Sequence, residues 1–214
     1  MVSIGTEGPG TAACAGAIDV YFDFVSPYGW IAAERIGDVA TRFARPLRWH
    51  PILLKVTVLD TMGLPPPLET PLKGPYLHHD IARSLRYHGL CLAEAARFGF
   101  SSLAAARAVL WARGAAPDHL HALILALYRA HWSDGRDISR GDTVLDIVTD
   151  VGLPRAAAAA ALQSDVVKQA LADENAAAIG AGIFGSPTFV VDGETFWGAD
   201  RLPMVEMWIA RGGW

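Results

Sequence analysis

Cysteine is scarce in this chain of 214 residues, which contains only Cys14 and Cys91. The two residues are far apart and form no C-x-x-C motif, so the sequence excludes a redox dithiol of that type and a disulfide framework. A chain with so few cysteines has no visible adaptation to an oxidising compartment. We therefore expect a cytoplasmic protein.

An excess of basic residues and a long apolar run are also absent. The formal net charge is −4 and the sequence pI is about 5.9, so we expect no nucleic acid partner. No apolar run reaches the length of a membrane-spanning helix, and we expect no membrane partner. Residues 1–17 lack a basic n-region and a continuous apolar core, so they do not resemble a signal peptide. Their Gly, Thr, Ala and Pro content predicts a flexible leader.

A strand that ends where a helix begins is predicted in residues 18–43. Apolar side chains recur at every second position from Ile18 to Phe24, the period of a strand with one face more deeply buried. Ser26 then offers a hydroxyl for a helix N-cap, and Pro27 suits the first helical turn because it has no N–H to satisfy. This pattern predicts a hydroxyl at the positive end of a helix, where an anion is stabilised.

The rest of the chain changes type along its length. Residues 46–54 read as a second strand, parallel to the first because a helix connects them, and the proline-rich residues 63–76 read as an extended loop. Residues 76–179 have helical character almost throughout. Two short β-prone runs then flank Asp192-Gly193, a strong hairpin signal, and the final residues predict a helix.

This order of elements is of the thioredoxin type. We predict an α/β protein, a thioredoxin-like fold with a large all-helical insertion. Its parts are a flexible leader (1–17), a discontinuous thioredoxin-like domain (18–64 and 182–214) and an inserted helical domain (65–181). In such a fold the proline before the third strand, here Pro187, is cis and lies beside the start of the first helix. We expect that bond to turn the N–H and C=O of Ser186 outward, where an extended peptide can pair with them.

Four segments together resemble one known family: "FDFVSPYGW", "TPLKGPYLHHDIAR", "HWSDGRDIS" and "GIFGSPTFVVDGETFWGADRL". They are similar to the 2-hydroxychromene-2-carboxylate isomerases and kappa-class glutathione transferases, which belong to the DsbA-like branch of the thioredoxin superfamily. The resemblance extends over nearly the whole chain from about Ile18 and includes the helical insert. It implies a homodimeric enzyme that uses glutathione and has a serine in place of the redox C-x-x-C.

The resemblance assigns roles to individual residues. The Ser26 hydroxyl is too weak an acid to replace a thiolate, but it can donate a hydrogen bond to a glutathione sulfur at a helix N-terminus that also favours the anion. A plain N-cap is the alternative for Ser26, and also for Asp200, which by similarity holds the γ-glutamyl amino group. The predicted catalytic residue is Ser26, the predicted glutathione-binding residues are Pro27, Tyr28, Lys73, Ser186, Pro187, Ala199 and Asp200, and Tyr28 and Trp197 are expected to line a pocket for a small aromatic substrate.

The chain departs from the family pattern at two of these places. Leu64 stands where the kappa pattern has an asparagine, so one amide that binds a glutathione carboxylate is missing. Ala199 stands where kappa enzymes often have serine. Lys73 is retained, either as a contact for a carboxylate or as a solvated loop residue. The histidines have no metal-binding spacing, and we expect no metal.

The resemblance implies a glutathione-dependent cis-trans isomerase of aromatic pyruvates, as in the degradation of aromatic compounds. Glutathione thiolate adds to a conjugated double bond, rotation follows, and loss of the thiolate restores the double bond. A kappa-class-like glutathione transferase or peroxidase is the alternative, because it shares the glutathione site. A thioredoxin-like binding module without catalysis is a third interpretation.

Overall fold

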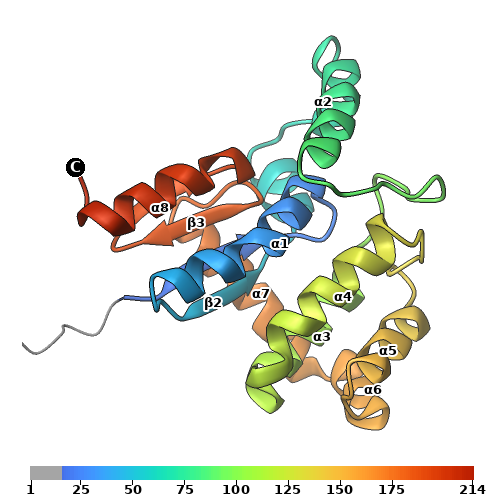
Figure 1. Cartoon of the computed structure of the whole chain (residues 1–214). Coiled ribbons are helices and arrows are strands. Elements are labelled where there is room, and N and C mark those ends of the chain that lie inside the picture. The colour runs from blue at the N-terminus through green and yellow to red at the C-terminus, as the bar shows by residue number, and fades with distance from the viewer. Residues whose placement is uncertain (1–15) are drawn as a thin grey trace, which may run out of the picture.

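Four strands form one mixed sheet in the computed structural model, which describes residues 16–214 (Figure 1). The order is β2-β1-β3-β4, with β1 (Ile18–Phe22) parallel to β2 (Leu47–Pro51) and antiparallel to β3 (Thr188–Val191). β3 and β4 (Glu194–Trp197) form the predicted hairpin. Residues 1–15 of the predicted leader lie outside the described part of the chain.

Helices make up most of the chain outside the sheet. α1 (Pro27–Arg42) connects β1 to β2, and α8 (Leu202–Arg211) closes the chain, as predicted. The predicted helical block contains α2 (Lys73–Tyr87), α3 (Leu103–Ala115), α4 (Leu120–Trp132), α5 (Gly141–Asp150), α6 (Arg155–Gln163) and α7 (Asp165–Gly180). This is the predicted thioredoxin-like fold with a large helical insertion, while the exact domain boundaries remain a prediction. No helix in residues 16–214 is long and apolar enough to cross a membrane.

Two local expectations were wrong. The second strand ends at Pro51, and a short π-helix, η1 (Lys55–Thr61), follows it. The predicted proline-rich loop also ends early, because α2 begins at Lys73 after the short 3-10 turn η2 (Pro67–Glu69). Pro75 lies in the first turn of α2, where its missing N–H removes no hydrogen bond within the helix, so it does not prevent the helix from starting at Lys73.

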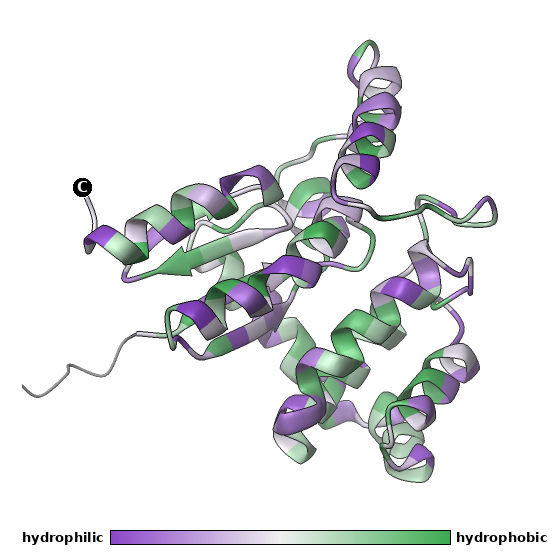
Figure 2. Ribbon diagram, in the orientation of Figure 1, coloured by the Kyte–Doolittle hydropathy of each residue, from purple (hydrophilic) through white to green (hydrophobic). Residues whose placement is uncertain are grey.

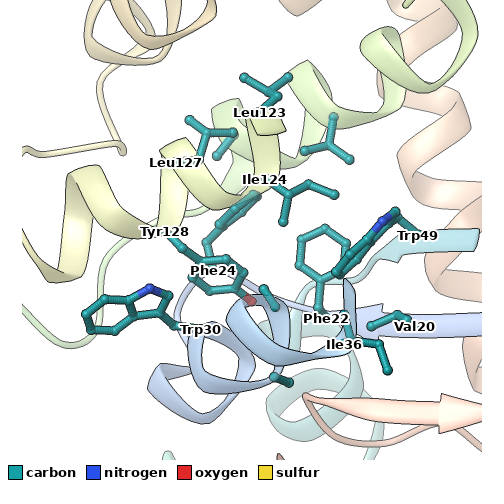
Figure 3. Packing of buried hydrophobic residues seen from close by; sticks show 14 of the residues in the cluster. Val20, Phe22, Phe24, Trp30, Ile36, Trp49, Leu123, Ile124, Leu127 and Tyr128 are labelled. Carbon is teal, nitrogen blue, oxygen red and sulfur yellow. The ribbon is translucent and has the colours of Figure 1, made fainter. Parts of the chain in front are cut away.

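The sheet and the helical insert share one core (Figure 3). Phe22 of β1 contacts Trp49 of β2 edge to face, with ring centroids 5.3 Å apart, and the ring of Phe24 lies 4.7 Å from that of Tyr128 on α4. All four side chains are buried. Figure 2 shows the middle of α4 as hydrophobic, whereas α2 is largely hydrophilic. The insert is therefore fixed to the sheet by continuous apolar burial.

The opposite face of β1 is polar and carries a chain of ion pairs. Asp19 accepts hydrogen bonds from Arg48 at 2.7 and 2.6 Å and contacts His50 Nε2 at 2.8 Å. His50 Nδ1 lies 2.5 Å from Glu174 of α7, which also accepts two hydrogen bonds from Arg113 of α3. This network joins β1, β2, α3 and α7. It explains why only one face of the first strand is apolar.

We predict that Glu174→Gln destabilises the protein in a pH-dependent way. Burial acts to raise the pKa of Glu174, but hydrogen bonds from His50 and Arg113 outweigh it and lower the pKa from 4.5 to about 2. The carboxylate therefore stabilises the fold above about pH 4.5, and this contribution is lost as the pH falls toward 2. At pH 7 the variant should lose roughly 2 kcal/mol in urea unfolding, with a gap that closes near pH 2.

The exposed Asp173→Asn on the same helix is the control and should change little at any pH. An equal gap for Glu174→Gln at pH 7 and pH 2.5 would contradict an ionic origin.

Candidate functional site

The start of α1 and the loop before β3 meet at a pair of serines. Ser26 is the N-cap of α1, and its Oγ accepts a hydrogen bond from the Gly29 N–H at 3.0 Å. The same hydroxyl donates to the carbonyl oxygen of Ser186 at 2.9 Å. The Ser186-Pro187 peptide bond is cis, as predicted. Residues 160 positions apart are thereby brought into direct contact.

The predicted outward presentation of Ser186 is wrong for its carbonyl, because that oxygen is bonded to Ser26. The amide N–H of Ser186 fits the prediction, since it has no hydrogen-bond partner within residues 16–214. The amide N–H of Tyr28, in the first turn of α1, likewise has no partner in that range. Pro27 has no N–H. Two unpaired backbone donors therefore lie next to Ser26, which is the arrangement that receives an anion at a helix N-terminus.

Buried Asp23 contacts Ser186 of this pair. The sequence analysis did not identify it as a site residue, because it resembles an ordinary polar residue of the strand. Its carboxyl group is buried and accepts hydrogen bonds from Ser102 Oγ at 2.6 Å, Leu54 N–H at 2.7 Å and Val25 N–H at 3.2 Å. Its own N–H donates to Ser186 Oγ at 2.9 Å. Burial raises the pKa of Asp23 above 3.8 although these hydrogen bonds favour the charged form.

Helix α4 donates two side-chain hydrogen bonds to the backbone between β1 and α1. Tyr128 donates its hydroxyl proton to the backbone carbonyl of Asp23 at 3.0 Å, and Trp132 Nε1 donates to the carbonyl of Phe24 at 3.0 Å. Both side chains are fully buried, so Trp132 is a core residue and not part of a substrate pocket. Burial raises the pKa of Tyr128 well above 10, so it stays a neutral donor.

Tyr28 is held by the protruding helix α2. Its hydroxyl donates to Asp80 at 2.5 Å, and Asp80 is also bound by Arg83 and, at 3.5 Å, by Tyr76. Burial and the Asp80 carboxylate raise the pKa of Tyr28 far above 10. The hydroxyl of Tyr28 is therefore engaged, and its half-buried ring is what remains to line a pocket.

Lys73 and Leu64 lie on the exposed connection that leads into α2. Lys73 is exposed, and its side chain forms no hydrogen bond or ion pair with any other residue of the range 16–214. Leu64 is 48% exposed. The lysine is thus available to a carboxylate in solution, while the leucine offers only an apolar surface.

Two aromatic side chains lie beside the loop around Pro187. Trp197 is 53% exposed and contacts Phe184 edge to face at 4.7 Å, over Gly185, where any β-carbon would come within 2.2 Å of the indole nitrogen. The N–H of Gly198 donates to the carbonyl of Pro187 at 2.9 Å, which holds the following residues near the cis bond. An exposed aromatic surface therefore borders the two serines.

Ala199 and Asp200 come after Trp197 in the chain and lie in the short turn before α8. Ala199 is buried, whereas the Asp200 side chain is 74% exposed and lies 3.5 Å from Arg201. Asp200 caps neither this turn nor α8 with its side chain, so the N-cap alternative is wrong. The roles of Ser26, Pro27, Tyr28, Lys73, Ser186, Pro187, Trp197, Ala199 and Asp200 toward a ligand remain predictions.

Cysteine and metal chemistry have no visible place here. Within residues 16–214 the one cysteine, Cys91, is exposed and lies between α2 and α3. In the same range no group of three or more His, Cys, Asp or Glu side chains is arranged to hold a metal ion.

We predict that Asp23→Asn changes the pH dependence of stability. Because the folded-state pKa of Asp23 lies above its unfolded value of 3.8, wild type should lose stability as the pH rises between these two values. The Asn side chain of the variant cannot ionise, so its free energy of unfolding should not fall over this pH range. At low pH the variant should nevertheless be less stable than wild type by roughly 1–3 kcal/mol, because one of its hydrogen-bond acceptors has become a donor. Its deficit in urea unfolding should shrink from pH 3 to pH 7.

Asp134→Asn, at an exposed turn, serves as the control. A deficit of Asp23→Asn that grows with pH would mean that the three donors, and not burial, dominate the titration of Asp23.

Comparison with known proteins agrees with this arrangement. The family model for a DsbA-like thioredoxin domain matches residues 17–210. A 2-hydroxychromene-2-carboxylate isomerase of Sphingobium xenophagum is 28% identical over 90% of this chain and 97% of its own length. A glutathione S-transferase kappa 2 of Caenorhabditis elegans is 24% identical over 91% of this chain and 92% of its own.

Solved structures give the same result. A 2-hydroxychromene-2-carboxylate isomerase superposes with a TM-score of 0.81 at 25% identity, covering 91% of this chain and 95% of that one. The cytosolic disulfide reductase DsbM from Pseudomonas aeruginosa with GSH has a TM-score of 0.66 at 18% identity, covering 91% and 96%. The resemblance to these isomerases and transferases is confirmed, and the chain belongs to the DsbA-like thioredoxin family.

Proposed function

We propose that the protein is a glutathione-dependent cis-trans isomerase that acts on aromatic pyruvates of the 2-hydroxychromene-2-carboxylate type. The observation that carries this proposal is the Ser26 hydroxyl at the N-terminus of α1, bonded to Ser186 before the cis proline. The isomerase relatives, of which the chain covers nearly the whole length, support the reaction class. A homodimer and a cytoplasmic location are part of this proposal.

The residues present fit glutathione. The unpaired N–H groups of Ser186 and Tyr28 are donors for an extended peptide and an anion, and Lys73 and Asp200 offer exposed charges of opposite sign. When bound, glutathione supplies a thiolate that adds reversibly to a conjugated double bond and so permits rotation about it. The missing amide at Leu64 and the missing hydroxyl at Ala199 remove two contacts, so we expect weaker binding than in relatives that have both.

Ser26 has one hydroxyl proton, and it is bonded to the Ser186 carbonyl. To donate to a sulfur, the hydroxyl must rotate away from that oxygen, while Oγ can keep accepting from Gly29. The positive end of α1 adds to the stabilisation of a nearby anion. Ser26 therefore lowers the pKa of a bound thiol by hydrogen bonding and does not itself attack the substrate.

The site also has groups for the substrate. The exposed pair of Trp197 and Phe184 offers an aromatic surface beside the cis proline. Lys73 is the free cation that can bind a substrate carboxylate or stabilise a developing enolate. The hydroxyl of Tyr28 is bonded to Asp80, so its half-buried ring is held in the first turn of α1.

We predict that Ser26→Ala lowers the isomerisation rate by about 10- to 100-fold, since a hydrogen bond to a charged group contributes about 1.5–3 kcal/mol. The relaxation of 2-hydroxychromene-2-carboxylate toward its open-chain trans isomer is followed by ultraviolet absorbance, with and without glutathione. The matched control is Ser101→Ala, at an exposed serine. A Ser26→Ala enzyme as fast as wild type would exclude thiolate activation by this residue.

The amount of glutathione left after the reaction separates the two enzyme classes. An isomerase regenerates glutathione, so its concentration stays constant while substrate is converted. A kappa-class-like transferase consumes it. Loss of glutathione in proportion to product would favour the transferase.

We also predict that Asp200→Ala raises the KM for glutathione about 10-fold with little change in kcat, because it removes a charge that faces the γ-glutamyl ammonium. Its ion pair with Arg201 is exposed and contributes little to stability, so the melting temperature should not move. Asp118→Ala, at another exposed short turn, is the control. An unchanged KM would remove Asp200 from the binding site.

A further inference from the structure

We propose that a groove between η1, α3 and α7 is a second ligand site, which binds a small organic carboxylate with an apolar body. The groove has a volume of about 310 Å³, at the lower end of the range for small-molecule sites. None of its lining residues belongs to the predicted glutathione or substrate site. The inference does not depend on the proposed isomerase function.

The walls of the groove are mainly apolar. Leu53 and Val56 come from the segment after β2, Leu103 from α3, and Leu171 and Ala172 from α7. Such a surface favours the hydrocarbon or aromatic part of a ligand. It does not provide the several polar partners that a nucleotide or a sugar requires.

One cationic side chain in the groove lacks a counter-charge. Lys168 is paired with Asp165 at 2.7 Å, but within residues 16–214 no carboxylate lies within ion-pair distance of Arg107. The Nε of Arg107 is buried and has no hydrogen-bond partner, and Nη1 makes only a long 3.4 Å bond to the carbonyl of Leu162.

An unsatisfied buried donor costs free energy, and a carboxylate can bind a guanidinium through two parallel hydrogen bonds. One uncompensated positive charge on an apolar surface is complementary to a monoanion with an apolar body. A neutral apolar ligand would leave the positive charge of Arg107 without a counter-charge.

The groove lies next to the backbone that supports the serine site. The N–H of Leu53 donates to Asn175 Oδ1 at 2.8 Å, and the next N–H, of Leu54, donates to the buried Asp23. Leu103 follows Ser102, whose hydroxyl also donates to Asp23. The groove and the serine site thus adjoin the same two backbone segments, at residues 53–54 and 102–103. They share no lining side chain.

Octanoate is the probe, and octanamide is its uncharged counterpart. Calorimetric titration of the full chain should show octanoate binding at least 10-fold more tightly than octanamide, with or without saturating glutathione. Arg107→Met keeps the apolar stem and should weaken octanoate binding at least 10-fold, whereas Arg140→Met, at an exposed arginine outside the groove, should change nothing.

Ala172→Trp fills the groove from an exposed position and should abolish octanoate binding while circular dichroism remains native, which keeps the test valid if Arg107→Met fails to fold. The proposal is overturned if octanamide binds as tightly as octanoate, or if folded Arg107→Met and Ala172→Trp both bind octanoate like wild type. Displacement of octanoate by glutathione would also overturn it, because the anion would then occupy the serine site.

Discussion

The hydrogen bonds of buried Asp23 are the constraint on which the arrangement of the site depends. The carboxyl group binds the segment after β2 through Leu54 and the start of α3 through Ser102. The backbone of the same residue binds the cis-proline loop through Ser186 and helix α4 through Tyr128. Polar groups removed from water must find partners, so these four segments are held in one relative position. Ser26 and Ser186 meet because Asp23 fixes the segments that carry them.

The hydroxyl of Ser26 lies at the N-terminus of α1. Within residues 16–214 the one cysteine, Cys91, lies between α2 and α3, whereas the residue at the start of α1 is Ser26. The fold still provides the positive end of α1 and an unpaired backbone donor beside a cis proline. The chain is similar both to a 2-hydroxychromene-2-carboxylate isomerase and to a kappa glutathione S-transferase.

The two faces of β1 make different kinds of contact: one face is apolar, and the other is polar. One face joins the sheet to the helical insert through aromatic residues such as Phe22 and Tyr128, and this burial extends beneath the serine site. The other face carries the ion pairs of Asp19, His50 and Glu174, which attach α7 to the sheet. α7 also lines the groove beside Arg107. The ion pairs on the polar face of β1 therefore help to position this groove, which lies outside the serine site.

The sequence by itself determined most of the helices and strands and the place of Ser26 at the start of a helix. The alternation from Ile18 to Phe24, the Ser-Pro helix start and the Asp-Gly hairpin are local signals, because backbone conformation over a few residues decides them. Only the tertiary structure decided that the Ser26 proton goes to Ser186, that Tyr28 is engaged by Asp80 and that Asp23 is buried. The hydrogen bonds of Ser26 and Tyr28 join residues 160 and 52 positions apart, and no local pattern encodes which distant donor reaches a given acceptor. The π-helix after β2 was also missed; it contacts α7, which is distant in the sequence.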